Sequence, residues 1–562
     1  MDNIKVCALG GLDENGRDCY VIEINNDLFV VEAGSSLPDK TIPGVDFLLP
    51  NAEYIIQNRN RLKAYIITHG HDESMSGLKY FYNRAPAPVY CTETTRKCML
   101  GQASILKVKT NFDFHIVDPS STVTIAGHII HFFQTCHSVA FSMGVAFETD
   151  RGNIAYTSDF IVDYSLNEVG YIFDLPALGR ISEKETLLLL SPSKGAAHSG
   201  YCAPKHRIVY LIEKYFKDCE QRIFTSCFWQ NLYRIRGILL LCKKYHKKLY
   251  FYDDYTREVM AFLGSRDDDM LRDIDVVKPE DLLRVKEQDL VILILGHGTE
   301  IYEKIGKLAA RSNEDKRITI GPKDIFISAA LPTPTQEVVA TRSLDSLYRT
   351  GCEVVWLNNK VLLPMHAHQD DLKVFLSLLK PKYYLPVRGS FVNLMSNAKL
   401  ALSMGVGFNH SNVFILDNGM QLVFDDSPRP HMVPNETNHI NISPVLVDGT
   451  GISKVGAELI EERRQLGFDG AVVVAATVNV EQKKILAGPD CQMRGFVFVK
   501  EAEPLLKSIS NIYVEEVNNA LNAPGKFETA KVEDVIRERA KRFIRRENGR
   551  EPMILPIIIE TK

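Results

Sequence analysis

The feature that most constrains this chain is a set of four short apolar runs near its start, each followed by acidic or histidine side chains. The runs cover residues 28–31, 64–67, 129–133 and 154–156. They read as buried strands because they are short, apolar and bounded by turn residues. The polar residues that follow them are Glu32, His69 with His71, His137, and Asp159. Strands that deliver polar groups to one edge build the sites of many α/β and sandwich enzymes, so the pattern predicts such a site here.

Length and composition set broad limits on the molecule. A chain of 562 residues is expected to hold about three to four domains. The net charge of -4 does not indicate nucleic-acid binding by the molecule as a whole. The 11 cysteines are scattered and form no C-x-x-C pair, which favours a reducing cytoplasm over a disulfide framework. No apolar stretch is long enough to span a bilayer and no signal peptide is visible, so we expect a cytoplasmic protein without a membrane partner.

Two further regions follow the first one. Residues 204–365 have an α/β rhythm, with a helix predicted at 232–245 and strands predicted at 248–252, 290–295, 325–328 and 353–356. The proline-rich segment 425–444 reads as a linker. The remaining residues, 445–562, read as a separate unit that ends in an amphipathic helix near 532–546.

The polar residues after the first strands have the character of a metal site. In Thr68-His69-Gly70-His71 two histidines flank one glycine on a turn, so both can point into one cavity. Zinc takes neutral imidazole and carboxylate ligands, usually four of them. An isolated H-x-H is more often an ordinary polar turn, but His137 and Asp159 supply the remaining ligands in the same context. The alternative is that the four residues form a satisfied polar cluster without metal.

These motifs, in this order, resemble the metallo-β-lactamase fold, and downstream segments narrow the resemblance to the β-CASP branch and the ribonuclease J family. The segments that carry it are 331–337, 366–373, 380–389 and 552–560. The resemblance covers nearly the full length. It implies an α/β fold: a metallo-β-lactamase αββα sandwich with an inserted β-CASP α/β domain and a small α+β C-terminal domain. It also implies RNA processing and mRNA decay by 5′-to-3′ exoribonuclease and endoribonuclease activity.

The resemblance also implies domain boundaries. The sandwich is expected at 1–203 and 366–424, the β-CASP domain at 204–365, the linker at 425–444 and the C-terminal domain at 445–562. In the family the C-terminal domain supports self-association. The helix at 532–546 is therefore expected to pack within that domain or across a dimer interface.

The two-zinc site of the family carries over only in part. His69, His71 and His137 match the ligands of the first zinc, and Asp159 matches the bridging aspartate. The second zinc requires an aspartate and two histidines, and the residues at these positions are Glu73, Ser74 and Arg388. Glu32 stands where a supporting aspartate is expected. Arginine stays protonated and would repel a second zinc ion by about 8 kcal/mol at ~4 Å, so we expect one zinc ion at most, or none.

Positions outside the metal site are also altered. His366 matches a family histidine that would act as a proton donor, together with Asp159, if the chain is catalytic. Pro192 replaces the β-CASP carboxylate, and Asp253 with Asp254 replaces a basic turn. The RNA-binding element is matched only by Asn231 and Arg234. A lysine cluster at 243–248 reads as a solvated helix end rather than an RNA site.

Three functions remain open from the sequence. The first is a weakly active or inactive structural or RNA-binding subunit, in a homo-oligomer or in a hetero-oligomer with an active ribonuclease J paralogue. It is favoured by the degenerate second metal site. The alternative is a functional single-metal RNA phosphodiesterase that uses the intact first site. A small-ester hydrolase on the same fold is disfavoured by the full-length resemblance.

Overall fold

The computed structural model describes the whole chain except residues 39–41, 43, 218, 264–269, 449–450, 453–456, 497–501 and 562. It contains two compact units. The first comprises Met1–Leu37 and Phe47–Ile452, and the second comprises Pro38–Asp46 and Ser453–Lys562.

The first unit is built on two facing sheets. One sheet has the order β20 (His431–Val433), β19 (Gln421–Phe424), β1 (Ile4–Gly10), β2 (Cys19–Ile24), β3 (Asp27–Val31), β5 (Leu62–Ile66), β6 (Val89–Cys91), β7 (Phe114–Ile116). The other has the order β18 (Tyr383–Val387), β12 (Thr186–Pro192), β11 (Gly152–Tyr156), β10 (Met143–Thr149), β9 (His128–Gln134), β8 (Thr122–Ile125). The sandwich core lies between them because alternate side chains of each strand, such as Phe29 and Val31 in β3 and Phe132 in β9, are buried together.

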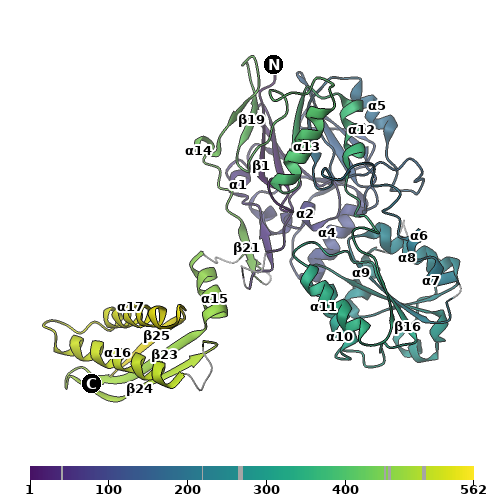
Figure 1. Cartoon of the computed structure of the whole chain (residues 1–562). Helices are drawn as coiled ribbons and strands as arrows, with labels where there is room; N and C mark the ends of the chain where they lie inside the picture. Colours follow the sequence, from purple (N-terminus) through teal and green to yellow (C-terminus); the bar gives the residue numbers. More distant parts are fainter. Residues whose placement is uncertain are drawn as a thin grey trace. The chain divides into compact units, whose positions relative to one another are not determined.

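Helices cover the outer faces of both sheets, which gives the αββα arrangement (Figure 1). Buried residues of α1 (Glu53–Gln57), α3 (Leu78–Phe81) and α4 (Glu93–Ile105) join the core on the first sheet. Those of α5 (Leu175–Ser182), α12 (Gln369–Leu379) and α13 (Phe391–Ser403) join the core on the second. The expected αββα sandwich is therefore confirmed.

A parallel α/β domain is inserted between β12 and β18. Its five strands, all parallel to their neighbours, are β14 (Lys248–Phe251), β15 (Leu290–Gly296), β13 (Arg222–Phe228), β16 (Asp324–Ser328) and β17 (Glu353–Trp356), in that order. Its helices are α6 (Val209–Ile212), α7 (Lys214–Lys217), α8 (Leu232–Lys244), α9 (Asp254–Leu263), α10 (Glu300–Ala309) and α11 (Glu337–Tyr348). The helix and strands predicted for this region are confirmed.

The sheets bring several strand ends to one edge of the sandwich. In the second sheet β11, β12 and β18 run parallel and end at Tyr156, Pro192 and Val387. In the first sheet β3 and β5 run parallel and end at Val31 and Ile66. The residues just past these ends therefore meet, although they come from distant parts of the sequence.

The predicted linker 425–444 is partly folded. Residues His431–Val433 form β20, which pairs antiparallel with β19, and Asn435–Asn438 form α14. Beyond it, β21 (Val445–Asp448) pairs with β4 (Phe47–Leu49) and with β22 (Gly451–Ile452). This segment is therefore not a free linker. The sequence did not predict its strand, because a strand can pair with an edge strand through its backbone without an apolar pattern.

The second unit has its own core. The strand β23 (Ala471–Asn479) lies between β24 (Lys484–Arg494) and β25 (Met553–Thr561). The helices are α15 (Ala457–Asp469), α16 (Ala502–Asn522) and α17 (Thr529–Asn548). Alternate residues of β23 pack with the apolar faces of α16 and α17, including Ile509 and Ile536. The predicted terminal helix therefore packs within this unit.

All 11 cysteines are free. Nine of them are buried, and only Cys219 and Cys491 are partly exposed. Among the described residues no helix is long and apolar enough to cross a membrane.

Candidate metal centre

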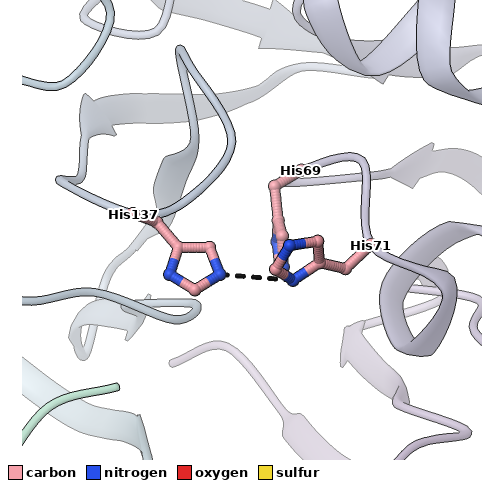
Figure 2. Close-up of side chains that lie close together, drawn as sticks. All are labelled: His69, His71 and His137. Atoms are coloured by element: carbon pink, nitrogen blue, oxygen red, sulfur yellow. Dashed lines mark hydrogen bonds between the residues drawn. The ribbon is translucent and has the colours of Figure 1, made fainter. Parts of the chain in front are cut away.

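Three histidines meet at the shared edge of the two sheets. His69 and His71 follow β5, just before the short helix α2 (Asp72–Met75), and His137 follows β9. Figure 2 shows the three rings turned toward one another. One ring nitrogen from each lies within 4.8 Å of the others, and His137 Nε2 lies 3.3 Å from His71 Nδ1. Among the described residues, this is the group whose atoms are placed to hold a metal ion.

The second nitrogen of each ring is fixed from outside the cluster. His137 Nδ1 lies 2.8 Å from the Met365 carbonyl and His71 Nε2 lies 3.0 Å from Ser138 Oγ. His69 Nδ1 lies 2.9 Å from Thr68 Oγ1. Because a carbonyl only accepts, the contact with Met365 places the proton of neutral His137 on Nδ1 and directs the lone pair of its Nε2 into the cluster. The residues therefore fit a metal ion that takes imidazole ligands.

Electrostatics keep these imidazoles neutral. Burial and the neighbouring imidazole of His71 hold the pKa of His69 and of His137 well below its usual range. Burial likewise lowers the pKa of His71. Neutral imidazole is the form that coordinates a metal.

Asp159, the fourth predicted ligand, is held by two cations. Its Oδ2 lies 2.9 Å from Arg388 Nη2 and 3.8 Å from Lys194 Nζ. Burial disfavours the carboxylate, but Arg388 and Lys194 hold the pKa of Asp159 well below its usual range. The structure thus brings the three histidines together and turns Asp159 toward the cations beside them.

Arg388 is completely buried in the acidic half of the site. It follows β18 in the left-handed backbone region, with φ of 58°, and its side chain is 0% exposed. Its Nη2 lies 2.9 Å from Asp18 Oδ2, and its Nη1 donates to Tyr156 Oη at 2.9 Å. It also reaches the other acidic and hydroxyl groups around it: Glu32 at 3.5 Å, Ser74 at 3.2 Å and Glu73 at 3.9 Å.

Lys194 supplies a second cation that the sequence did not predict. It follows β12, two residues after Pro192, and its Nζ donates to Glu73 Oε1 at 2.9 Å. Glu73 Oε1 also lies 3.8 Å from His71 Nδ1. A signal was available in the sequence, because Lys194 follows the apolar run 187–190 as the other site residues follow theirs.

The four acids of the site differ in how firmly they hold a negative charge. Burial raises the pKa of Asp18 to about 7 and that of Glu32 to about 8, although Arg388 opposes both shifts. Burial acts on Glu73 in the same direction, but Lys194, His71 and Arg388 hold its pKa well below the usual range. Asp159 and Glu73 are therefore the carboxylates held most firmly in the charged form, beside the two cations. Asp18 was also missed from the sequence, because it stands in a turn with no motif.

The other predicted residues lie in different surroundings. Glu32 accepts a hydrogen bond from Thr68 N at 3.2 Å, behind His69. His366 Nδ1 lies 3.6 Å from Asp159 Oδ1, and its side chain is 23% exposed. Asn231 caps α8 by accepting from Arg234 N at 3.1 Å. The buried guanidinium of Arg234 donates to the carbonyls of Ala329 and Leu363 at 3.1 and 3.3 Å. Their contact with RNA stays a prediction.

The three histidines of this site can bind a metal ion, whereas the acids next to them are neutralised by Arg388 and Lys194. A metal ion bound by the three imidazoles would supply Lewis-acid activation of water. The chain's own residues would hold it and orient its ligands through Met365, Ser138 and Thr68. His366 is placed beside Asp159, with access to solvent, where an imidazole can give or take a proton.

Comparisons with known proteins agree with this fold and site. The metallo-beta-lactamase superfamily matches residues 12–191, and the ribonuclease J C-terminal domain family matches residues 458–561. Ribonuclease J 2 of Streptococcus pyogenes serotype M3 is 29% identical over 564 residues, covering 100% of each chain. Ribonuclease J2 of Bacillus subtilis strain 168 is 28% identical over 566 residues, covering 100% of this chain and 99% of that protein.

One solved structure shows a similar fold. It is the crystal structure of a protein of unknown function from Enterococcus faecalis V583, with a TM-score of 0.51 at 12% identity. The match covers 75% of this chain and 100% of that one. At this identity the likeness concerns the fold alone.

Fold and histidine cluster together define a member of the metallo-β-lactamase superfamily, with a parallel α/β domain inserted between β12 and β18. The C-terminal match and the full-length likeness to ribonuclease J2 proteins take this one step further. The chain belongs to the ribonuclease J family.

Proposed function

We propose that the protein works in RNA processing and mRNA decay, with weak or no nuclease activity of its own. It would serve as a structural or RNA-positioning partner of an active ribonuclease J paralogue. Support comes from the full-length likeness to ribonuclease J2 proteins of two organisms.

The observation that carries the impaired activity is the position of Arg388. Its buried guanidinium lies 2.9 Å from Asp159 and 3.9 Å from Glu73, the carboxylates that a second metal ion would need. A two-metal phosphodiesterase clamps the attacking and leaving oxygens between its ions. With arginine in this place, that clamp would be missing.

The alternative function is a single-metal RNA phosphodiesterase. It is favoured by the histidine cluster, whose ligand atoms lie within 4.8 Å of one another. It is also favoured by His366, 3.6 Å from Asp159. In this case one zinc ion held by His69, His71 and His137, with Asp159 beside it, would activate water.

Assembly and location belong to the same proposal. The C-terminal domain, residues 445–562, would support self-association or pairing with the active paralogue. The protein would act in the cytoplasm, with RNA and the paralogue as its partners.

Cleavage of RNA separates the two functions. The purified full-length chain, loaded with zinc or manganese, is given a 5′-monophosphorylated RNA, with His71→Ala as the matched control. We expect cleavage indistinguishable from the control and copurification with a complete ribonuclease J. Robust cleavage by the wild type that disappears in His71→Ala would establish the alternative.

Metal content is the second measurement. Protein purified without chelator is expected to carry about one equivalent of zinc or manganese, because three oriented imidazoles hold such an ion. His71→Ala should lose it. A content below about a tenth of an equivalent in the wild type would exclude the single-metal enzyme.

A further inference from the structure

Two cationic side chains share two carboxylates on the acidic side of the histidine cluster. Lys194 Nζ lies 2.9 Å from Glu73 and 3.8 Å from Asp159. Arg388 Nη2 lies 2.9 Å from Asp159 and 3.9 Å from Glu73. Each cation therefore contacts both acids, as one ion placed between them would.

The contacts are made by charge more than by directed hydrogen bonds. Within the described part of the chain, four buried atoms of this group have no hydrogen-bond partner of acceptable geometry. They are both carboxylate oxygens of Asp159, Arg388 Nη2 and Asp18 Oδ2. Yet Arg388 Nη2 stands 2.9 Å from Asp18 and from Asp159, all of them buried. A buried carboxylate without such a counter-charge is strongly unfavourable.

The two cations differ in how deeply they lie. Arg388 is 0% exposed, whereas the side chain of Lys194 is 14% exposed. Arg388 is therefore the inner counter-charge, shared with Asp18 and Glu32. Lys194 is the outer one, nearest to the solvent from which an ion would enter.

We propose that Lys194 and Arg388 together replace a second metal ion in this pocket. The pocket has the form of a divalent-cation site, with four acids: Asp18, Glu32, Glu73 and Asp159. The positive charge between these acids comes from the two side chains and not from a bound ion. A second ion is excluded by occupancy and charge and not only by the lack of histidine ligands. This inference rests on the proposed function and concerns the same site. It states what takes the place of the second metal ion there.

The proposal has a chemical consequence. With the two cations removed, the pocket presents oxygen ligands, namely the carboxylates and the hydroxyls of Ser74 and Tyr156. Oxygen ligands are those preferred by Mg²⁺ and Mn²⁺. A divalent ion should then bind and restore the stability that the loss of the cations takes away.

The test measures binding of Mn²⁺ alone to full-length protein. All variants carry His71→Ala, which weakens the histidine cluster so that an additional ion in the acidic pocket is counted separately. In this background we compare Lys194→Ala, Lys194→Arg and Lys194→Ala/Arg388→Ala by calorimetric titration. Lys184→Ala is the matched control, because Lys184 forms an ion pair of 2.7 Å with Glu148 away from the site.

We expect the double variant to gain one Mn²⁺, bound at least about tenfold more tightly than in the background protein. Lys194→Ala, which keeps Arg388 in the pocket, should gain none, and neither should Lys194→Arg or Lys184→Ala. Millimolar Mn²⁺ should raise the Tm of the double variant and leave that of Lys184→Ala unchanged.

The proposal is overturned if the double variant binds no more Mn²⁺ than Lys184→Ala. It is also overturned if the double variant stays unfolded in Mn²⁺, since rescue by an ion is what the replacement requires. Because no RNA is used, these outcomes are independent of whether the protein cleaves or binds RNA.

Discussion

At the scale of single residues, Arg388 decides the character of the site. Its backbone is fixed between the two sheets, since its N–H donates to Gly11 O and its carbonyl accepts from Ser193 N, both at 3.1 Å. The left-handed φ of 58° is uncommon for a residue with a Cβ. The conformational cost of this backbone geometry is offset by the ion pairs between the guanidinium and the acids around it.

Replacing Arg388 by methionine should therefore be strongly destabilising. The change leaves Asp18 and Asp159 buried without their main counter-charge, which costs about 3–5 kcal/mol. Thermal unfolding of the full chain measures it as a fall in Tm. Arg257→Met is the control, because the pair of Arg257 with Asp254 is exposed and contributes about 0–1 kcal/mol. Equal effects of the two changes would contradict this account.

At the scale of elements, the start of α12 ties together the loops that carry the site. The Asp371 carboxylate accepts from Val162 N at 2.7 Å, Cys202 N at 3.0 Å and His368 N at 2.9 Å. These donors come from the loop after Asp159, from the start of the insertion, and from the turn that carries His366. One acid thus fixes three chain segments around the metal centre.

Asp371→Ala should loosen these three segments at once. It leaves three amides without their acceptor, and each buried amide without an acceptor costs about 1–3 kcal/mol. Hydrogen exchange of peptides that contain Val162 and Cys202 should become faster, and the Tm should fall. Asp370→Ala is the neighbouring control, since Asp370 pairs with Lys373 at a half-exposed position. Unchanged exchange in Asp371→Ala would show that the tie is not needed.

One contribution to the pH dependence of stability comes from a buried histidine in the same region. Burial lowers the pKa of His206 to about 4, although the Asp163 carboxylate 3.4 Å away favours the charged form. Its ordinary pKa is about 6.5. Since the folded pKa is the lower one, the unfolded chain binds more protons between these values. The stability contributed by neutral His206 is therefore complete above about pH 6.5 and is lost as the pH falls toward 4.

His206→Gln should reduce this loss. The fall in Tm between pH 7 and pH 5 is expected to be smaller in the variant than in the wild type, as measured by thermal unfolding in matched buffers. His410→Gln is the control, because His410 is exposed. An equal fall in Tm in the wild type and in His206→Gln would assign the acid sensitivity to other groups.

The sequence predicted elements better than the details of the site. The strands before Glu32, His69, His137 and Asp159 were found because apolar runs ending in polar residues are a local signal. Lys194 and Asp18 were missed because the residues they contact at shortest distance, Glu73 and Arg388, lie far from them in sequence. The strand β20 was missed because His431–Val433 is largely exposed and pairs through its backbone.

At the scale of the whole molecule, the chain consists of two units with separate hydrophobic cores. Units of this kind can unfold in separate cooperative steps. Leu190 belongs to the core of the first unit, and Ile536 belongs to that of the second.

Calorimetry of the full chain should show two thermal transitions. Ile536→Ala should lower only one of them and Leu190→Ala only the other, because each substitution removes about 2–5 kcal/mol from a single core. Each variant serves as the control for its counterpart. A shift of both transitions by either change would show that the units unfold together.

The two partly exposed cysteines are natural attachment points for fluorescent dyes. Cys219 belongs to the first unit and Cys491 to the second, while the other nine thiols are buried. A thiol-reactive dye pair would therefore attach at one point in each unit without engineered sites. Burial raises the pKa of Cys491 to about 11, which lowers the fraction of reactive thiolate at this position. Energy transfer between the dyes would then follow the separation of the two units as RNA or a partner chain is added.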